Sequence, residues 1–220
     1  MRRLLACTAM VLAGCSELIS PTRATPYEYR QFVVNGPNDV DTVTFHWPRS
    51  FMPVRIWVAS DEPLRAPVDT AIARWEGALL FGEFRAEIVS DSNQADVIVR
   101  NVPSPGGIGL SKLRLDAMAP ECLGATDIAT DAALTQVILP MHVYVWPRFS
   151  PDNPNIDTCY EITATHEMGH VLGIISPFHS PNSGDVMFSN PVFNGLSDRD
   201  IATAETVYHT PSRLVPVGRR

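Results

Sequence analysis

The run His166-Glu167-Met168-Gly169-His170 constrains the fold of this chain more than any other feature. On a helix, residues four apart lie one above the other, so the His166 and His170 imidazoles can reach one ion. Glu167 then projects to the side of that ion, where an attacking water would sit. The sequence therefore predicts a helix that presents two zinc ligands and a general base.

The residues after this helix extend the pattern. Gly173 comes three residues after His170, and we expect it to end the helix at a turn that needs φ > 0. His179 follows in a proline-rich loop, and Met187 lies eight residues further on. Here the chain resembles the metzincin peptidases, and among them the matrixin branch. Their motif, H-E-x-x-H-x-x-G-x-x-H, is followed by a methionine turn beneath the zinc.

This resemblance implies a zinc-dependent endopeptidase that hydrolyses peptide bonds with a metal-activated water. It assigns the zinc ligands to His166, His170 and His179, the general base to Glu167, and structural roles to Gly173 and Met187. It also implies a zincin-like domain over about residues 54–209, with a C-terminal helix at 197–208.

The spacing before the third histidine departs from the family motif. Five residues separate Gly173 from His179 where the family usually has two, and Ser176 stands at the usual ligand position. A serine hydroxyl is a poor zinc ligand beside imidazole, so we interpret the three additional residues as a bulge before His179. If His179 did not reach the metal, Asp185 would be the nearest oxygen donor in the sequence.

The rest of the chain predicts an α/β (α+β) domain. Residues 54–59 alternate and are rich in β-branched and aromatic side chains, which is typical of a strand. Apolar residues at helical spacing from Val68 to Leu79, after Pro67, predict an amphipathic helix. Further strands are expected at 84–89, 95–100, 123–130 and 134–146, with a short one at 108–115. We therefore expect a twisted mixed β-sheet with an active-site helix, a backing helix and a C-terminal helix.

Two details of this arrangement bear on the site. Thr158 and Glu161 have the spacing of a capping box, so the zinc helix should begin near Thr158. We assign 123–130 as the edge strand, where a substrate peptide could add as an extra strand. A plain structural edge strand is the alternative.

The first residues are typical of an export signal. Two arginines precede an apolar run at 4–13 that is too short to span a bilayer. The run ends in Leu12-Ala13-Gly14-Cys15, which resembles the lipobox of bacterial lipoproteins. We therefore expect a lipoprotein signal peptide at 1–14 and lipidation of Cys15, which would anchor the exported chain to a bacterial membrane. Ser16, rather than an aspartate, follows Cys15, which in such lipoproteins indicates the outer membrane. An ordinary signal peptide with a chance cysteine is the alternative.

The remaining chain is expected to form one domain, because its length is close to that of a single domain and 45% of it is hydrophobic. Prolines and polar residues without periodicity predict a tether at 15–40. The metallopeptidase domain is expected at 41–210, and a tail at 211–220.

Two cysteines, Cys122 and Cys159, are left for the folded body. In an oxidising compartment we expect them to form a disulfide between the start of strand 123–130 and the first turn of the zinc helix. Two buried thiols are the alternative.

The charge of the chain argues against a nucleic acid partner. Its formal net charge is −7, and loss of two positive charges with the signal peptide makes it −9. Such an acidic body repels phosphate backbones. The expected partners are a protein or peptide substrate and, through the lipid, a membrane, and we expect a monomer.

Other metals and other functions were weighed. Residues 101–135 contain no histidine, so we expect no second, structural zinc. Calcium could bind Asp127, Asp131 or the loop at 152–157, but short acidic loops are usually only solvated. A non-catalytic lipoprotein that keeps the zinc for protein binding is the main alternative function. A structural zinc closed by a fourth protein ligand is the other, and no nearby cysteine or histidine supports it.

Overall fold

The computed structural model describes residues 24–60, 62–106 and 112–218. They form a mixed α/β fold with a seven-stranded sheet, a separate two-stranded hairpin and three α-helices. Along the chain the elements are β1 (Gln31–Gly36), β2 (Asp39–Val43), β3 (Val54–Val58), α1 (Arg65–Ala78), β4 (Ala86–Val89), β5 (Val97–Arg100), β6 (Lys112–Met118), β7 (Cys122–Thr130), β8 (Gln136–Pro147), α2 (Ile156–Leu172), α3 (Asp198–His209) and β9 (Val215–Val217). The expected mixed sheet with three helices is confirmed.

The sheet has a parallel half and an antiparallel half. Its strand order is β4-β3-β5-β8-β7-β6, and β9 pairs with β8 off this path. β4, β3, β5 and β8 are parallel neighbours, whereas β7 runs antiparallel to both β8 and β6. β3 alternates between buried and half-buried residues because one of its faces packs on the core.

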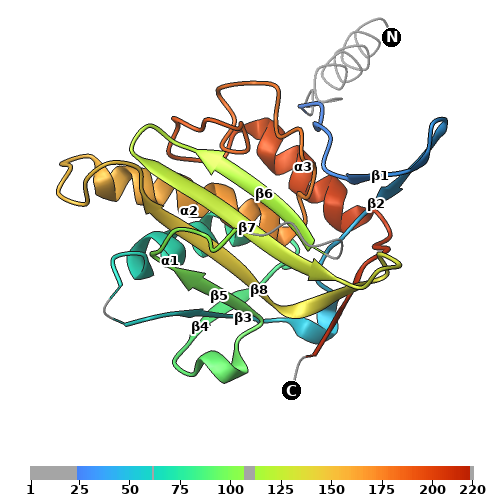
Figure 1. Cartoon of the computed structure of the whole chain (residues 1–220), viewed down its shortest axis with the longest axis horizontal. Helices are drawn as coiled ribbons and strands as arrows, with labels where there is room; N and C mark the ends of the chain where they lie inside the picture. The colour runs from blue at the N-terminus through green and yellow to red at the C-terminus, as the bar shows by residue number, and fades with distance from the viewer. Residues whose placement is uncertain (1–23, 61, 107–111, 219–220) are drawn as a thin grey trace, which may run out of the picture.

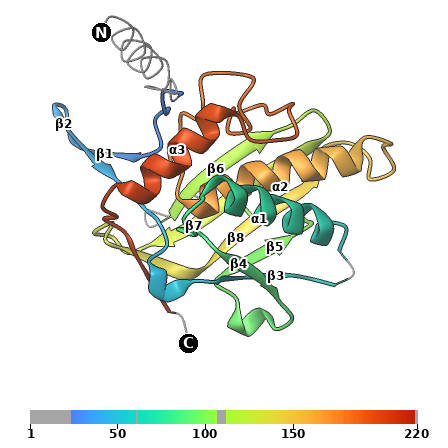
Figure 2. The same ribbon diagram turned by 180° about the vertical axis from the view of Figure 1, so that it is seen from behind.

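Helices α1 and α2 lie together on one face of the sheet, as Figures 1 and 2 show from opposite sides. The buried Trp75 indole of α1 donates a 2.9 Å hydrogen bond to the Thr165 carbonyl of α2. Beside it, the Arg74 guanidinium bonds the Glu161 carboxylate and the Thr165 hydroxyl. The backing helix therefore fixes α2 by its apolar face and by an ion pair at its margin.

The edge of the sheet differs from the prediction. We assigned 123–130 as the edge strand, but β7 (Cys122–Thr130) has a neighbour on each side, β8 and β6. β6 (Lys112–Met118) is the strand at this end, later in the chain than the short strand expected at 108–115. Part of that expected strand, residues 107–111, lies outside the described residues. The residues of the strand itself do not reveal which strand lies at the edge, because strand order depends on long-range pairing.

The segments expected as tether and tail both take part in the fold. The described part of 15–40 includes β1, which pairs antiparallel with β2, and a buried Tyr27 whose hydroxyl bonds Asp200 of α3. Within 211–220, β9 pairs parallel with β8. Each has backbone hydrogen bonds to a distant segment, Tyr29 with the Ile175 amide and β9 with β8, which composition does not reveal. The expected signal peptide at 1–14 and Cys15 lie outside the described residues.

The start of α2 also corrects a prediction. The helix begins at Ile156 after Asn155, and no side chain caps it, so the Thr158–Glu161 capping box is wrong. A capping box forms instead at α3, where the Ser197 hydroxyl accepts from the Asp200 amide and the Asp200 carboxylate accepts from the Ser197 amide. Among the described residues, no helix has the length and apolar character needed to cross a bilayer.

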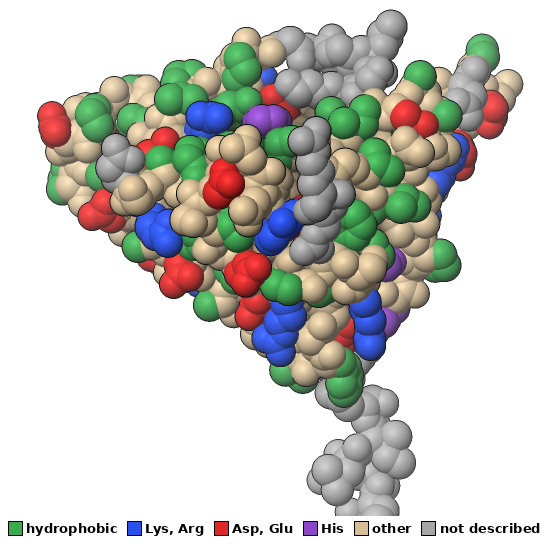
Figure 3. All heavy atoms as spheres, turned by 90° about the horizontal axis from the view of Figure 1, so that it is seen from below, with side chains coloured by type: hydrophobic (Ala, Val, Ile, Leu, Met, Phe, Trp, Pro, Cys, Tyr) green, Lys and Arg blue, Asp and Glu red, His purple; other side chains and the backbone are tan. Residues whose placement is uncertain are grey.

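Acidic and basic side chains are interspersed over the face drawn in Figure 3, and no broad basic stripe gathers there. Over the whole chain, acidic residues outnumber basic ones, with 24 aspartates and glutamates against 17 lysines and arginines.

Candidate metal centre

Helix α2 brings two imidazoles together, as its spacing predicts. The Nε2 atoms of His166 and His170 lie 3.0 Å apart, and both side chains are fully buried. Their Nδ1 atoms are within 2.7 Å of the Val186 carbonyl and 2.6 Å of the Ile174 carbonyl, respectively. A carbonyl can only accept, so each Nδ1 carries the proton and each Nε2 presents a lone pair.

His179 completes the group. Its ring centroid lies 5.1 Å from that of His166 and 5.2 Å from that of His170, and the ligand atoms of the three residues all lie within 4.8 Å of one another. Its backbone has φ 53°, a left-handed conformation that histidine adopts more readily than most residues. The longer path from Gly173 therefore still delivers the third imidazole to the helical pair.

These donors fit a metal ion. Two neutral Nε2 lone pairs that face each other at 3.0 Å repel unless a cation lies between them. A tetrahedral zinc with Zn–N bonds of about 2.0 to 2.1 Å places its nitrogen ligands about 3.3 Å apart. The Nε2 of His179 is buried and has no hydrogen-bond partner within the described structure. Three converging, unpartnered nitrogen donors of this kind could hold one metal ion.

Burial keeps the ligands in the neutral form that metal binding requires. Desolvation, aided by the charge of His179, lowers the pKa of His166 to about 3. Desolvation is also the largest cause that lowers the pKa of His170 and, to a smaller extent, that of His179.

Glu167 lies beside the histidines beneath strand β7. The Thr126 hydroxyl donates to its Oε2 over 2.5 Å, and its Oε1 has no partner among the described side chains. A Cβ at Gly124 would collide with Oε1, so this strand can approach the carboxylate closely only with glycine there. Burial raises the pKa of Glu167 well above its usual range, and the Thr126 hydrogen bond opposes that shift.

Asp185 braces the loop that carries His179. Its carboxylate accepts from the Ser180 hydroxyl and from the Ser197 hydroxyl at 2.7 Å, and it pairs with Arg199 at 3.4 Å. Asp185 is 2% exposed and is not in the group that could share an ion. It therefore supports the third ligand, and the fallback role of Asp185 as a ligand is not needed.

Asp200 holds the turn that contains Met187. Its carboxylate accepts from the backbone amides of Val186 at 2.9 Å and Met187 at 3.4 Å. Met187 is fully buried, and its sulfur packs against Gly169 of α2. Sequence reasoning did not find the roles of Asp185 and Asp200, although both are acidic residues close to predicted site residues.

Two further predicted structural positions behave as expected. Gly173 ends α2 with φ 132°, and a Cβ there would collide with the Phe45 carbonyl. Cys122 and Cys159 form a disulfide that joins the start of β7 to the first turn of α2. A disulfide fits an oxidising compartment outside the cytoplasm.

Other candidate metal residues do not gather into a site. Within the described ranges, the three histidines are the one group of three or more His, Cys, Asp or Glu residues close enough to share an ion. Asp131 instead accepts from Thr135 and from the Gln136 amide in the turn after β7. The acidic residues named for calcium thus have no cluster in this part of the chain.

His179 also lines a surface hollow of about 610 Å³. Residues 24–28, Phe178, Pro181 and Arg199 also line this hollow. Arg199 stacks on the Tyr27 ring at 5.8 Å, so the N-terminal segment is fixed there by α3.

No protein-family model matches this sequence, and no curated protein matches it significantly.

Proposed function

We propose that the chain is a zinc-dependent endopeptidase of the metzincin type, with a matrixin-like zincin domain. His166, His170 and His179 would hold the zinc, and Glu167 would be the general base. The observation that carries the proposal is the convergence of three unprotonated imidazole nitrogens beside a buried carboxylate. Zinc is the metal that three histidines with an open fourth position most often bind in hydrolases.

The group of three also bears on the kind of zinc site. A structural zinc is closed by four protein ligands, whereas a catalytic zinc keeps one position for water or substrate. Among the described residues the group contains three ligands. This composition supports a catalytic centre over a structural one.

The residues of the chain supply the proton transfers. When bound, zinc would activate a water for attack and polarise the carbonyl of a peptide bond. The free Oε1 of Glu167 is the atom that would take the proton of the attacking water and pass it to the leaving amine. Thr126 would hold the other oxygen, so that the carboxylate keeps one orientation through both transfers.

The location and partners belong to the same proposal. The lipobox-like Leu12-Ala13-Gly14-Cys15 and the disulfide support an exported chain anchored by Cys15 to a bacterial membrane. A protein or peptide outside the cytoplasm would be the substrate, and the chain would act as a monomer.

Glu167→Gln tests the proposal, because it removes the base while it keeps the shape of the side chain. We expect the wild type and the variant each to bind about one zinc per chain, measured by atomic emission. The variant should cleave an unstructured casein or peptide library at least a hundredfold more slowly than the wild type. Glu87→Gln, at an exposed position of β4, is the matched control and should change neither.

The same assay separates the alternatives. A non-catalytic zinc lipoprotein would bind the metal and show no chelator-sensitive cleavage at all. A structural zinc would make chelation unfold the domain, which circular dichroism would detect. Cleavage that persists in Glu167→Gln would reject the mechanism.

A further inference from the structure

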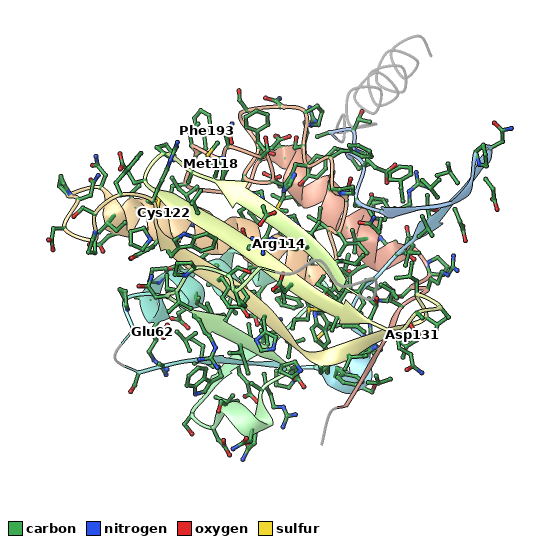
Figure 4. The ribbon with its side chains drawn as sticks, viewed as in Figure 1. Glu62, Arg114, Met118, Cys122, Asp131 and Phe193 are labelled. Carbon is green, nitrogen blue, oxygen red and sulfur yellow. A yellow bond between two sulfur atoms is a disulfide. The ribbon has the colours of Figure 1, made fainter. Side chains whose placement is uncertain are left out.

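Strand β6 covers the edge of β7 along most of the length of that strand. It pairs antiparallel from Lys112 opposite Ala129 to Met118 opposite Leu123. An exposed strand edge is where an extended peptide can add by backbone hydrogen bonds. In Figure 4, Cys122 and Asp131 mark the two ends of β7, and Arg114 lies on β6 alongside it. The edge nearest the metal centre is therefore already taken by the chain itself.

At its last residue, Met118, β6 is also bonded on its far side. The Met118 amide donates a 3.0 Å hydrogen bond to the Ser189 carbonyl, two residues after Met187. β6 thus lies between β7 and the loop that follows the methionine turn (Figure 1). A substrate peptide in a groove between these two walls would make the same kinds of backbone contact.

The buried side chains of β6 face the catalytic carboxylate. Residues opposite each other in an antiparallel pair point to the same face of the sheet. Leu115 lies opposite Thr126, whose hydroxyl bonds Glu167. Ala117 lies opposite Gly124, which lies against the Glu167 carboxylate. Leu115 is 2% exposed and Ala117 is 4% exposed, so both are part of the packed interior on this face.

The polar residues of β6 lie near enough to influence the centre. Burial is the main cause that raises the pKa of Glu167; Asp116 adds to this rise and Arg114 opposes it. Burial lowers the pKa of His179, and Asp116 opposes that shift. The Asp116 and Arg114 side chains pair with each other at 2.8 Å. Glu167, His166 and His170 are all fully buried.

We propose that β6 is a built-in pseudosubstrate strand: Leu115 and Ala117 occupy the peptide groove over Glu167, and the centre is latent until β6 leaves the edge of β7. The occupant that replaces it is an extended, unstructured peptide segment that adds to β7 as a strand. This inference rests on the proposed function and adds its regulation. The open population then sets the observed rate.

The test opens the strand and probes the vacated edge directly. Leu115→Asp places a charge in the buried face and should release β6, and Leu115→Ala is a milder version in case the first does not fold. Ile138→Asp changes a half-exposed apolar residue of β8 in the same sheet and is the control. Folding is followed by circular dichroism.

The probe is a fluorescein-labelled peptide with the sequence of residues 112–118, and its binding is measured by fluorescence anisotropy. Each variant carries Glu167→Gln in this experiment, so that the peptide is not cut. We expect the zinc-loaded Leu115 variants to bind it at least tenfold more tightly than the parent and the Ile138→Asp control. Equal binding by the parent and the folded Leu115 variants would overturn the proposal.

Activity distinguishes failure of this inference from failure of the proposed function. With Glu167 intact, the Leu115 variants should cleave an unstructured peptide at least tenfold faster than the wild type. If the wild type cleaves equally fast with dependence on Glu167, the endopeptidase proposal holds and the latency of β6 is refuted. If the opened variants bind the probe but cleave nothing, β6 is confirmed as a displaceable cover and the endopeptidase proposal fails.

Discussion

The two halves of the candidate metal centre are built in different ways. His166, Glu167 and His170 project from one helix whose residues from Ile162 onward are all buried, so their positions follow from helical geometry and core packing. His179 comes from an irregular loop, has a left-handed backbone and is only partly buried. That loop is held by hydrogen bonds to Asp185, which α3 and its cap bind in turn.

The difference shows that a ligand can be secured either by its own element or by a neighbour. The helical pair needs little beyond α2 itself, because spacing along a helix is local. The third ligand depends on Asp185, six residues further on, and through it on Ser197 and Arg199 at the start of α3. This support can be removed without a change in any ligand. Five substitutions, in four experiments, break or sharpen this contrast.

The largest effect is expected from the ligands themselves. His170→Ala and His179→Ala should each lower zinc affinity by more than the 100-fold that loss of a supporting residue costs. Only His170→Ala should also lower the melting temperature of the metal-free chain. It leaves a cavity in the interior, and the buried Ile174 carbonyl loses its hydrogen-bond partner. Calorimetry with zinc and thermal unfolding measure the two effects. His209→Ala, at an exposed position, should alter neither, and equal destabilisation by both ligand variants would contradict the contrast.

Asp200→Ala should destabilise the chain by about 3 kcal/mol, because it leaves buried amides of the methionine turn unpaired and removes one of the two hydrogen bonds of the capping box of α3. The Tyr27 hydroxyl would lose its 2.7 Å partner as well, so residues near Tyr27 should become accessible to proteases. Urea unfolding followed by tryptophan fluorescence gives the stability. Asp198→Ala, in the exposed first turn of the same helix, should cost less than about 1 kcal/mol. A small effect of Asp200→Ala would mean that the turn is stable on its own.

Asp185→Asn should weaken zinc binding by about 10-fold to 100-fold while the chain remains folded. The amide keeps the size of the side chain but loses the charge that holds Arg199 and one of the acceptors for the loop. Competition with a fluorescent zinc chelator measures the affinity. Asp152→Asn, in the exposed loop before α2, serves as the control. Unchanged affinity would show that the loop of His179 needs no brace.

Thr126→Val should have the smallest effect, a loss of about tenfold or less in peptide cleavage at neutral pH. The hydroxyl lowers the pKa of Glu167, so its removal raises that pKa further and leaves less of the base deprotonated at a given pH. The acid limb of kcat/KM should therefore move to higher pH. Thr130→Val, at the far end of β7, is the control. A shift of the limb to lower pH would contradict the assigned hydrogen bond.

The sequence predicted those parts of the centre that depend on local periodicity. The four-residue spacing of His166 and His170 and the helix end at Gly173 need only the geometry of one helix, and both are confirmed. The grouping of His179 with them was expected from a motif with an altered spacing, and the structure brings the three together. The prediction of an edge strand at 123–130 failed, because the position of β6 depends on pairing across the sheet.

The sequence by itself determined which functional groups the site contains: two imidazoles and a carboxylate on one helix, a third imidazole downstream, and a pair of cysteines. Tertiary structure alone decided how the third imidazole is held and what covers the carboxylate. Asp185 and Asp200 hold the loop through side-chain hydrogen bonds. β6 pairs with β7 through backbone hydrogen bonds, which do not depend on particular side chains. Contacts of that kind have no spacing rule along the chain, since they depend on which distant segments pack together.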